Sequence, residues 1–240
     1  RAMKLHGGGF STGGGKRPPK EELELENVEA TRGGAATNLR RHVRNLSSTD
    51  IPVVVSINLF SGDTEAEVEA IREEAIAAGA RDVVIFEGHA KGGEGAVKLS
   101  DAVVKACAAH DAAGRPYSPI VESGMPADQT ILRIATKVYG AQTVDFSPEA
   151  NRTLESLREW GLENLPVCMA KTQYSFSHEP KELGAPSGFA LPIRELRLNS
   201  GAGFIVAICG SMMTMPGLPV RPAAIDMDMD DNGRLTGVFS

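Results

Sequence analysis

The sequence has no long hydrophobic run, few aromatic residues and only three cysteines, and these shortages narrow its class. No apolar stretch approaches the roughly 20 residues of a membrane-spanning helix, and the first residues lack a charged-then-apolar secretory pattern. Acidic residues outnumber basic ones by 31 to 25, and this balance does not favour a general nucleic-acid binder. Cys107, Cys168 and Cys209 form no CxxC pair, which predicts buried thiols in a reducing compartment, not disulfides or zinc ligands.

Hydrophobic residues make up 42% of the chain, enough for a packed core. The β-branched run at 51–60 predicts a buried strand of the parallel kind, and 81–86 predicts a second strand. The helix between them begins with a capping-box pattern at Thr64 and Glu67 and ends at Gly79. Strand, helix, strand and helix at this spacing predict an α/β fold, a mostly parallel sheet flanked by helices with right-handed crossovers.

The rest of the chain continues this pattern. Ser147 and Pro148 are typical of the first residues of a helix. Helices are predicted at 93–114, 127–140 and 147–161, strands at 165–172 and 204–210, and a C-terminal β-hairpin at 223–239 that turns at Asn232-Gly233.

Glycine-rich sequence at 6–20 combines six glycines with Lys16 and Arg17, and it looks like a phosphate-binding loop. A Walker loop requires G-x-x-x-x-G-K-[ST], because backbone amides surround the phosphates and the hydroxyl binds magnesium. Here the first glycine is replaced by Phe10, and Arg17 stands where Ser or Thr is required. The segment therefore predicts a mobile surface loop and not a Walker loop.

Other partial motifs have simpler structural explanations. Gly201 and Gly203 begin a dinucleotide fingerprint, but the third glycine is Val206, so a tight turn before a strand is favoured. The segment 228–233 matches the start of a calcium loop, but position twelve is Phe239 instead of glutamate. The histidines form no HxxxH or HExxH pair, and no GxSxG elbow is present. The residues alone assign no catalytic side chain and no metal ligand.

Two polar, glycine-containing stretches, 58–65 and 86–95, follow the first two predicted strands. Ligands of open α/β sheets bind at the carboxyl ends of strands, which makes these stretches candidates for a binding site. An aromatic ring at Phe60 can stack on a flat heteroaromatic ligand. It can equally cover the core, and the spacing leaves both interpretations open.

Several stretches together resemble formate–tetrahydrofolate ligase, also called formyltetrahydrofolate synthetase. The likeness runs nearly end to end, through "RAMKLHGGG", "VVSINLFSGDTEAEV", "AKGGEGAVKLSDAVV", "AKTQYSFS" and "MTMPGLP". It implies an ATP-dependent ligase in which formate is phosphorylated to formyl phosphate and a tetrahydrofolate nitrogen then attacks the formyl carbon. It also implies Mg²⁺, stimulation by a monovalent cation, a cytoplasmic location and a homotetramer, with tetrahydrofolate, formate and ATP as partners and neither nucleic acid nor a membrane.

The resemblance also implies binding roles for particular residues. Phe60 matches the family's aromatic residue that stacks on the pterin ring, and His89 stands where the family has the opposing tryptophan. We add Lys91 as a candidate for the anionic glutamate tail of folate, because it adjoins the proposed stacking site. The resemblance places a further group near the nucleotide and folate cleft: Met215, Pro216, Gly217, Leu218 and Pro219.

The family's phosphate loop and the arginine that holds formyl phosphate belong to sequence that this chain does not contain. The chain is therefore expected to be a fragment of a larger P-loop-type ligase and to be inactive alone. Residues 1–45 would be the trailing end of the nucleotide-binding domain, and residues 46–240 the C-terminal α/β domain that contributes to the folate pocket. Two alternatives remain: a stand-alone folate-binding module, and an interaction domain that docks onto a separate nucleotide-binding subunit.

Overall fold

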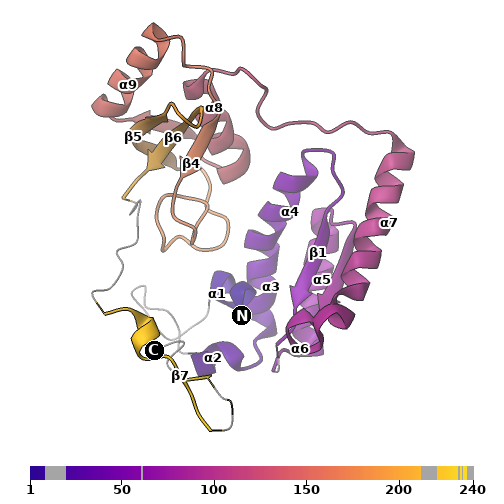
Figure 1. The fold of residues 1–240 in the computed structure, drawn as a ribbon. Coiled ribbons are helices and arrows are strands. Elements are labelled where there is room, and N and C mark those ends of the chain that lie inside the picture. The colour runs from indigo at the N-terminus through magenta and orange to yellow at the C-terminus, as the bar shows by residue number, and fades with distance from the viewer. Residues whose placement is uncertain (9–19, 61, 212–220, 232, 234, 237–240) are drawn as a thin grey trace.

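The structure is a computed structural model that describes residues 1–8, 20–60, 62–211, 221–231, 233 and 235–236 (Figure 1). Within these residues, no helix is both long and apolar enough to cross a membrane. The first part of the chain forms α1 (Ala2–Gly7), α2 (Lys20–Glu24), α3 (Val28–Gly34), the π-helical segment η1 (Ala35–Leu39), α4 (Arg40–Ser47), β1 (Val54–Asn58), α5 (Glu65–Ala78) and β2 (Asp82–Phe86).

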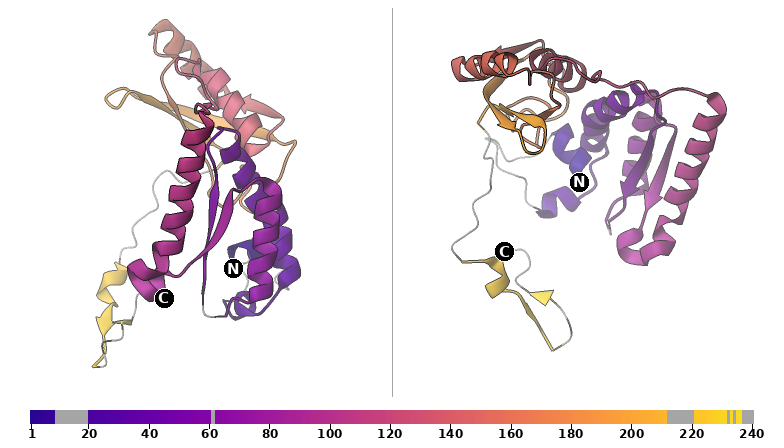
Figure 2. Two further views of the ribbon diagram at one scale, coloured as in Figure 1. Left: turned by 90° about the vertical axis from the view of Figure 1, so that its right-hand side faces the viewer. Right: turned by 45° about the horizontal axis from the view of Figure 1, so that its top comes forward.

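The strands β1 and β2 pair in parallel, from Val54↔Asp82 to Asn58↔Phe86, as the sequence predicted. They lie between α5 and α7 (Val97–Ala113), and α3, η1 and α4 pack beside α5 (Figures 1 and 2). Val43 of α4 and Val68 of α5 share one buried cluster with residues of both strands. The short α6 (Gly88–Lys91) and the 3-10 segment η2 (Gly92–Ala96) connect β2 to α7.

A second sheet of four strands has the order β3-β5-β6-β4. The pairs β3–β5 and β4–β6 are parallel, whereas β5–β6 is antiparallel with an irregularity between Ile193 and Glu195. Its elements are α8 (Ala127–Ile134), the π-helical η3 (Ala135–Tyr139), β3 (Thr143–Phe146), α9 (Pro148–Glu159), β4 (Val167–Ala170), β5 (Ala190–Asn199) and β6 (Phe204–Cys209). The protein is thus α/β, with parallel pairing and flanking helices as predicted, while β3 and β5 were not predicted.

The end of the described chain holds the 3-10 turn η4 (Ala223–Ile225) and two short antiparallel strands, β7 (Asp228–Met229) and β8 (Leu235–Thr236). Asn232, half of the proposed turn, lies outside the described residues, as does most of the glycine-rich stretch. The cysteine prediction needs correction. Cys209 is buried, but Cys107 and Cys168 are exposed, because both face away from the two hydrophobic clusters.

Helix ends follow the sequence signals closely. The Thr64 side chain accepts from the Glu67 amide, and the Glu67 carboxylate accepts in return from the Thr64 amide, which completes the capping box of α5. Gly79 ends this helix with φ of 107°, a left-handed conformation that glycine adopts without strain. Ser147 caps α9 by accepting from the Ala150 amide. These local predictions are confirmed.

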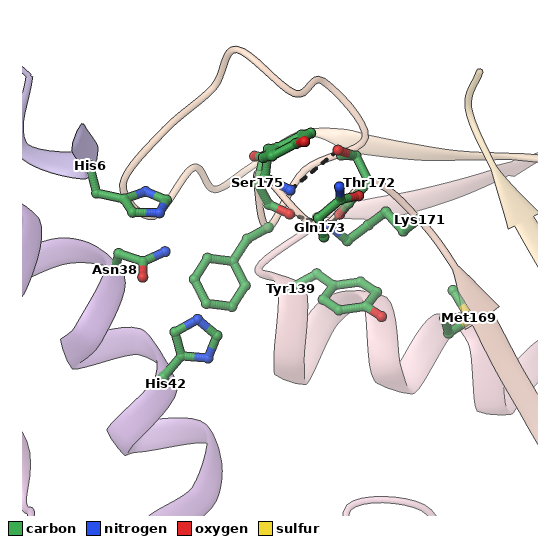
Figure 3. A pocket seen from close by; sticks show the side chains of 11 residues that line it. His6, Asn38, His42, Tyr139, Met169, Lys171, Thr172, Gln173 and Ser175 are labelled. Carbon is green, nitrogen blue, oxygen red and sulfur yellow. Dashed lines mark hydrogen bonds between the residues drawn. The ribbon is translucent and has the colours of Figure 1, made fainter. Parts of the chain in front are cut away.

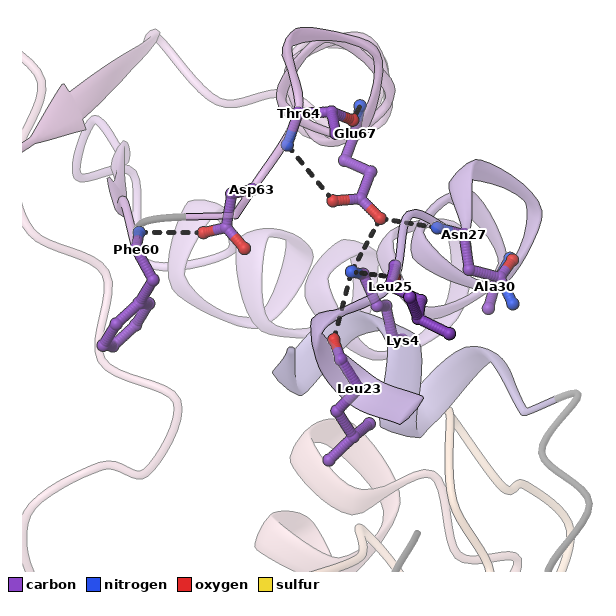
Figure 4. Close-up of polar contacts among 9 residues, drawn as sticks. All are labelled: Lys4, Leu23, Leu25, Asn27, Ala30, Phe60, Asp63, Thr64 and Glu67. Atoms are coloured by element: carbon purple, nitrogen blue, oxygen red, sulfur yellow. Dashed lines mark hydrogen bonds and ion pairs between the residues drawn. The ribbon is translucent and has the colours of Figure 1, made fainter. Parts of the chain in front are cut away.

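Glu67 also forms a buried ion pair with Lys4, and the pair joins α1 to α5 (Figure 4). The Lys4 Nζ lies 2.7 Å from the Glu67 Oε1, and both residues are almost fully buried. Lys4 donates further hydrogen bonds to the carbonyls of Leu23 and Leu25, at 3.1 and 2.8 Å. Glu67 accepts from the Asn27 amide at 2.7 Å. Burial by itself raises the pKa of Glu67, but the hydrogen bonds from Lys4, Asn27 and Thr64 outweigh it and lower that pKa.

Replacing Glu67 with glutamine is expected to destabilise the chain by about 3 kcal/mol, because it leaves the Lys4 ammonium buried without a counter-charge. Urea unfolding followed by circular dichroism measures this change. The matched control is Glu69→Gln, since Glu69 lies two residues away with a side chain that is 58% exposed.

Equal stability of the two glutamine variants would contradict this account. The double variant Lys4→Met/Glu67→Leu should recover part of the loss, because it removes both buried charges. The contribution of Glu67 should be present above its unfolded pKa of 4.5 and should disappear as the pH falls through the lower pKa of the folded protein.

Candidate functional site

A cavity of about 340 Å³ runs along β1, and Phe60 lies among its lining residues at the carboxyl end of the strand. Phe60 is 43% exposed, so its ring is not enclosed in the core. Its backbone is fixed by a tight turn in which the Phe60 amide donates to Asp63 Oδ2 at 2.9 Å (Figure 4). The Arg1 guanidinium lies 4.7 Å from the centre of the ring, a distance at which a cation and an aromatic face attract.

His89 and Lys91 lie on α6, which follows β2, and both are exposed. The pairing Asn58↔Phe86 brings α6 and Phe60 to the same end of the sheet, where the carboxyl ends of both strands lie. Neither residue lines the cavity beside Phe60. The Lys91 Nζ pairs with Glu87 one helical turn earlier, at 2.9 Å. Met215–Pro219 lie outside the described residues.

A second cavity of about 280 Å³ was not identified from the sequence (Figure 3). One wall comes from α1, η1 and α4, and the other from the segment after β4 that contains the family-like "AKTQYSFS". The residues that line it include His6, Asn38, His42, Tyr139, Lys171 and Phe176.

Lys171 folds this segment around its own ammonium group. Its Nζ donates to the carbonyls of Thr172 at 2.9 Å and Ser177 at 3.1 Å, and also to that of Ser175. It lies 5.0 Å from the centre of the Tyr139 ring. Burial lowers the pKa of Lys171 and raises the pKa of Tyr139 to about 12. An ammonium has three protons, and these three carbonyls use all of them.

The same segment is attached to the N-terminal helices through the backbone of Gly184. The Gly184 amide donates to His6 Nδ1 at 3.1 Å, and Asn38 Nδ2 donates to the Gly184 carbonyl at 3.2 Å. His42 packs its ring 4.7 Å from that of Phe176. Since Nδ1 accepts, His6 must be neutral here, and burial together with nearby His42 lowers the pKa of His6.

These two cavities contain no evident metal centre. In the described part of the chain, no group of three or more His, Cys, Asp or Glu side chains is placed to hold a metal ion. The sequence contains no motif that predicts the second cavity. Its histidines and its lysine occur singly and without the fixed spacing that marks a known binding site.

Comparison with known proteins gives one consistent family. The family description for formate–tetrahydrofolate ligase matches residues 1–239. The chain is 44% identical over 238 residues to the cytoplasmic C-1-tetrahydrofolate synthase of Schizosaccharomyces pombe. The aligned region covers 99% of this chain and 25% of that protein. It is also 44% identical over 239 residues to the formate–tetrahydrofolate ligase of Staphylococcus aureus strain JH9, covering 100% of this chain and 40% of that ligase. The chain therefore spans less than half the length of these relatives.

The attachment at Gly184 should depend on pH. Neutral His6 stabilises it above the unfolded histidine pKa of 6.5, and this stabilisation should be lost as the pH falls through the lower pKa of folded His6. Protection of the Gly184 amide from hydrogen exchange, corrected for the intrinsic rate, should fall about fivefold between pH 7.5 and 5, as expected for one lost hydrogen bond.

His6→Phe should abolish this protection at both pH values, whereas His6→Gln, which retains an oxygen acceptor, should keep it without pH dependence. His42, Lys171 and Arg41 also face this region, so His42→Gln is needed to separate their influence. His110→Gln on α7 serves as a distant control. An unchanged pH profile in His6→Gln would show that another group controls the attachment.

Proposed function

The chain belongs to the formate–tetrahydrofolate ligase family, and from this premise we propose that it supplies one wall of the folate pocket of such a ligase. The observation that carries the proposal is the position of Phe60. Its ring is exposed, lies at the carboxyl end of β1 and borders a cavity, which is where ligands of α/β sheets bind. A pterin ring can lie flat against it.

His89 and Lys91 would complete the folate contacts from α6, at the same edge of the sheet. His89 would face the pterin from the side opposite Phe60, and its imidazole offers less stacking area than an indole. Lys91 would pair with the glutamate tail of folate. Because Lys91 pairs with Glu87 on the exposed surface, it can exchange this partner for a ligand carboxylate at little cost. Met215–Pro219 would lie near the nucleotide and folate cleft, as the resemblance implies.

The proposed reaction proceeds in two steps. A formate oxygen attacks the γ-phosphorus of ATP, so that formyl phosphate forms and ADP leaves. The N10 nitrogen of tetrahydrofolate then attacks the formyl carbon, phosphate leaves with its bonding electrons, and the nitrogen loses a proton to give 10-formyltetrahydrofolate. Such chemistry depends mainly on positioning and on neutralising the phosphate charge. This chain would position the pterin, and sequence outside it would activate formate.

ATP and Mg²⁺ do not fit the residues described here. The glycine-rich stretch lacks the Walker residues, and the described residues offer no cluster of metal-ligating side chains. The carbonyls that surround Lys171 are bonded to its ammonium, so they offer no ready site for a monovalent cation. We propose that these ions and the nucleotide bind mainly to the remainder of the ligase.

We also propose a cytoplasmic homotetramer for the complete ligase. Several apolar side chains on α7 are exposed and would be available to a neighbouring subunit, among them Val97, Val103 and Val104. A stand-alone folate-binding module without ligase activity is the second candidate. Histidine at position 89 favours it, since a module freed from catalysis need not keep the larger ring.

Folate affinity should respond to both proposed stacking residues. Phe60→Ala should weaken tetrahydrofolate binding about fivefold, the loss of roughly 1 kcal/mol of stacking, whereas Phe60→Tyr should change it little. His89→Trp should tighten binding because the indole covers more of the pterin. Isothermal titration calorimetry measures each constant. Trp160→Ala is a suitable control, because Trp160 is an exposed aromatic residue at the end of α9.

If Phe60→Ala binds as tightly as the parent chain, the pterin does not lie on this ring. If His89→Trp leaves the affinity unchanged or weaker, His89 does not face the ligand.

The 240-residue chain alone should release no ADP in a formate-dependent manner when tetrahydrofolate and ATP are present. A coupled ADP assay measures this, with the intact Staphylococcus aureus ligase as the positive control. Measurable turnover by the isolated chain would contradict the proposal, because it requires a phosphate site within these residues.

A further inference from the structure

The sheet formed by β1 and β2 is too narrow for the helices that cover it. It has two strands, and parallel sheets of this kind normally contain more strands and are covered on both faces. On one face α5 lies beside α3, η1 and α4, and the ion pairs Arg32–Glu73 at 2.7 Å and Arg40–Glu74 at 2.5 Å join them. Two packed helices are about 10 Å apart, whereas two paired strands are only about 5 Å apart. The helix layer therefore extends past the edge of β1.

The backbone of β1 shows which groups point to that edge. The Val53 carbonyl accepts from the Arg81 amide at 2.7 Å, and the Leu59 amide donates to the Phe86 carbonyl at 3.2 Å. Because alternate residues of a strand bond to opposite sides, the backbone groups of Val54, Ser56 and Asn58 point away from β2. No strand among the described residues pairs with them there.

The 340 Å³ cavity lies along this free edge. Four consecutive residues of β1, from Val55 to Asn58, form one side, and Leu39, Val68 and Ile71 supply apolar surface. Thr31 also lines the cavity, and its Oγ1 is buried without a hydrogen-bond partner. Unpaired peptide groups on one side and apolar side chains on another are what an added β-strand requires.

We propose that this groove holds a further parallel β-strand, supplied by the part of the ligase that lies outside this chain. The relatives contain enough additional sequence to supply such a strand, since the matched region is only 40% of the Staphylococcus aureus ligase. A parallel strand would end beside Phe60, where Arg1 also lies. It could then connect directly into α1, and the path from it through α1–α4 to β1 would be an ordinary parallel crossover.

The added strand would also bring residues of the rest of the ligase close to the proposed folate site. Its carboxyl end would lie next to Phe60, and the residues that follow it would border the proposed pterin site. This inference rests on family membership and on the geometry of β1, and it does not require that folate binds to Phe60.

Hydrogen exchange of two proteins tests the inference: this 240-residue chain and the intact Staphylococcus aureus ligase. The amides of Val54, Ser56 and Asn58 should exchange freely in the chain, and the aligned amides of the ligase should exchange at least about 100-fold more slowly. The amides of Val55, Ile57 and Leu59, which face β2, should be protected in both proteins.

Fast exchange of the aligned amides in the intact ligase would overturn the inference. Protection that appears in the isolated chain and increases with its concentration would also overturn it, since a second copy would then fill the groove. Neither measurement uses folate, so failure here leaves the pterin proposal untouched.

Proline substitution provides a matched pair of variants. Ser56→Pro removes an amide that faces the groove, so β1–β2 protection in the isolated chain should persist. Proline at the aligned position of the intact ligase should abolish slow exchange at its neighbouring edge amides. Val55→Pro removes an amide that faces β2 and should disrupt β1–β2 in the chain itself. Should the proline ligase fail to fold, the exchange comparison of the unmodified proteins decides alone.

Discussion

The buried ion pair between Lys4 and Glu67 is the constraint on which the arrangement around β1 depends. Glu67 has two tasks, because its carboxylate caps α5 and also compensates the Lys4 ammonium. Lys4 in turn holds the backbone that leads from α2 to α3. The turn that carries Phe60 lies immediately before α5, the helix that Glu67 caps and joins to α1. Two buried charges tolerate only a narrow range of geometries, since each must keep its ion-pair partner and its backbone hydrogen bonds at the same time.

Sequence patterns predicted those features that depend on neighbouring residues. The capping box at Thr64, the end of α5 at Gly79 and the Ser147 cap each involve contacts within a few residues, and all are confirmed. The strand β5 escaped prediction because it contains Pro192 and charged residues, and its pairing with both β3 and β6 supports it from elsewhere in the sheet. The exposure of Cys107 and Cys168 was not predicted either. Burial depends on which face of a helix or strand meets a neighbouring element, and this also is decided by distant parts of the chain.

The same distinction between local and distant contacts applies to the candidate site. The rule that ligands bind at the carboxyl ends of strands located Phe60, but only the structure shows its ring exposed. The second cavity needed contacts between residues as distant as His6 and Gly184, or Asn38 and Gly184, which no local pattern encodes. The segment after β4 was noticed only through family resemblance. Its physical role, as a loop wound around Lys171, follows from coordinates alone.

The two lysines that line the cavities are both engaged within the protein. Lys4 gives its three protons to Glu67 and two carbonyls, and Lys171 gives its three to carbonyls of its own segment. Both lysines that line the cavities therefore stabilise the protein's own backbone and have no donor left for a phosphate. An ATP-dependent step must neutralise several negative charges on the transferred group. If the complete ligase transfers a phosphoryl group as proposed, these two lysines would not supply the donors, and the outside sequence that we expect to complete the sheet beside β1 is our candidate source.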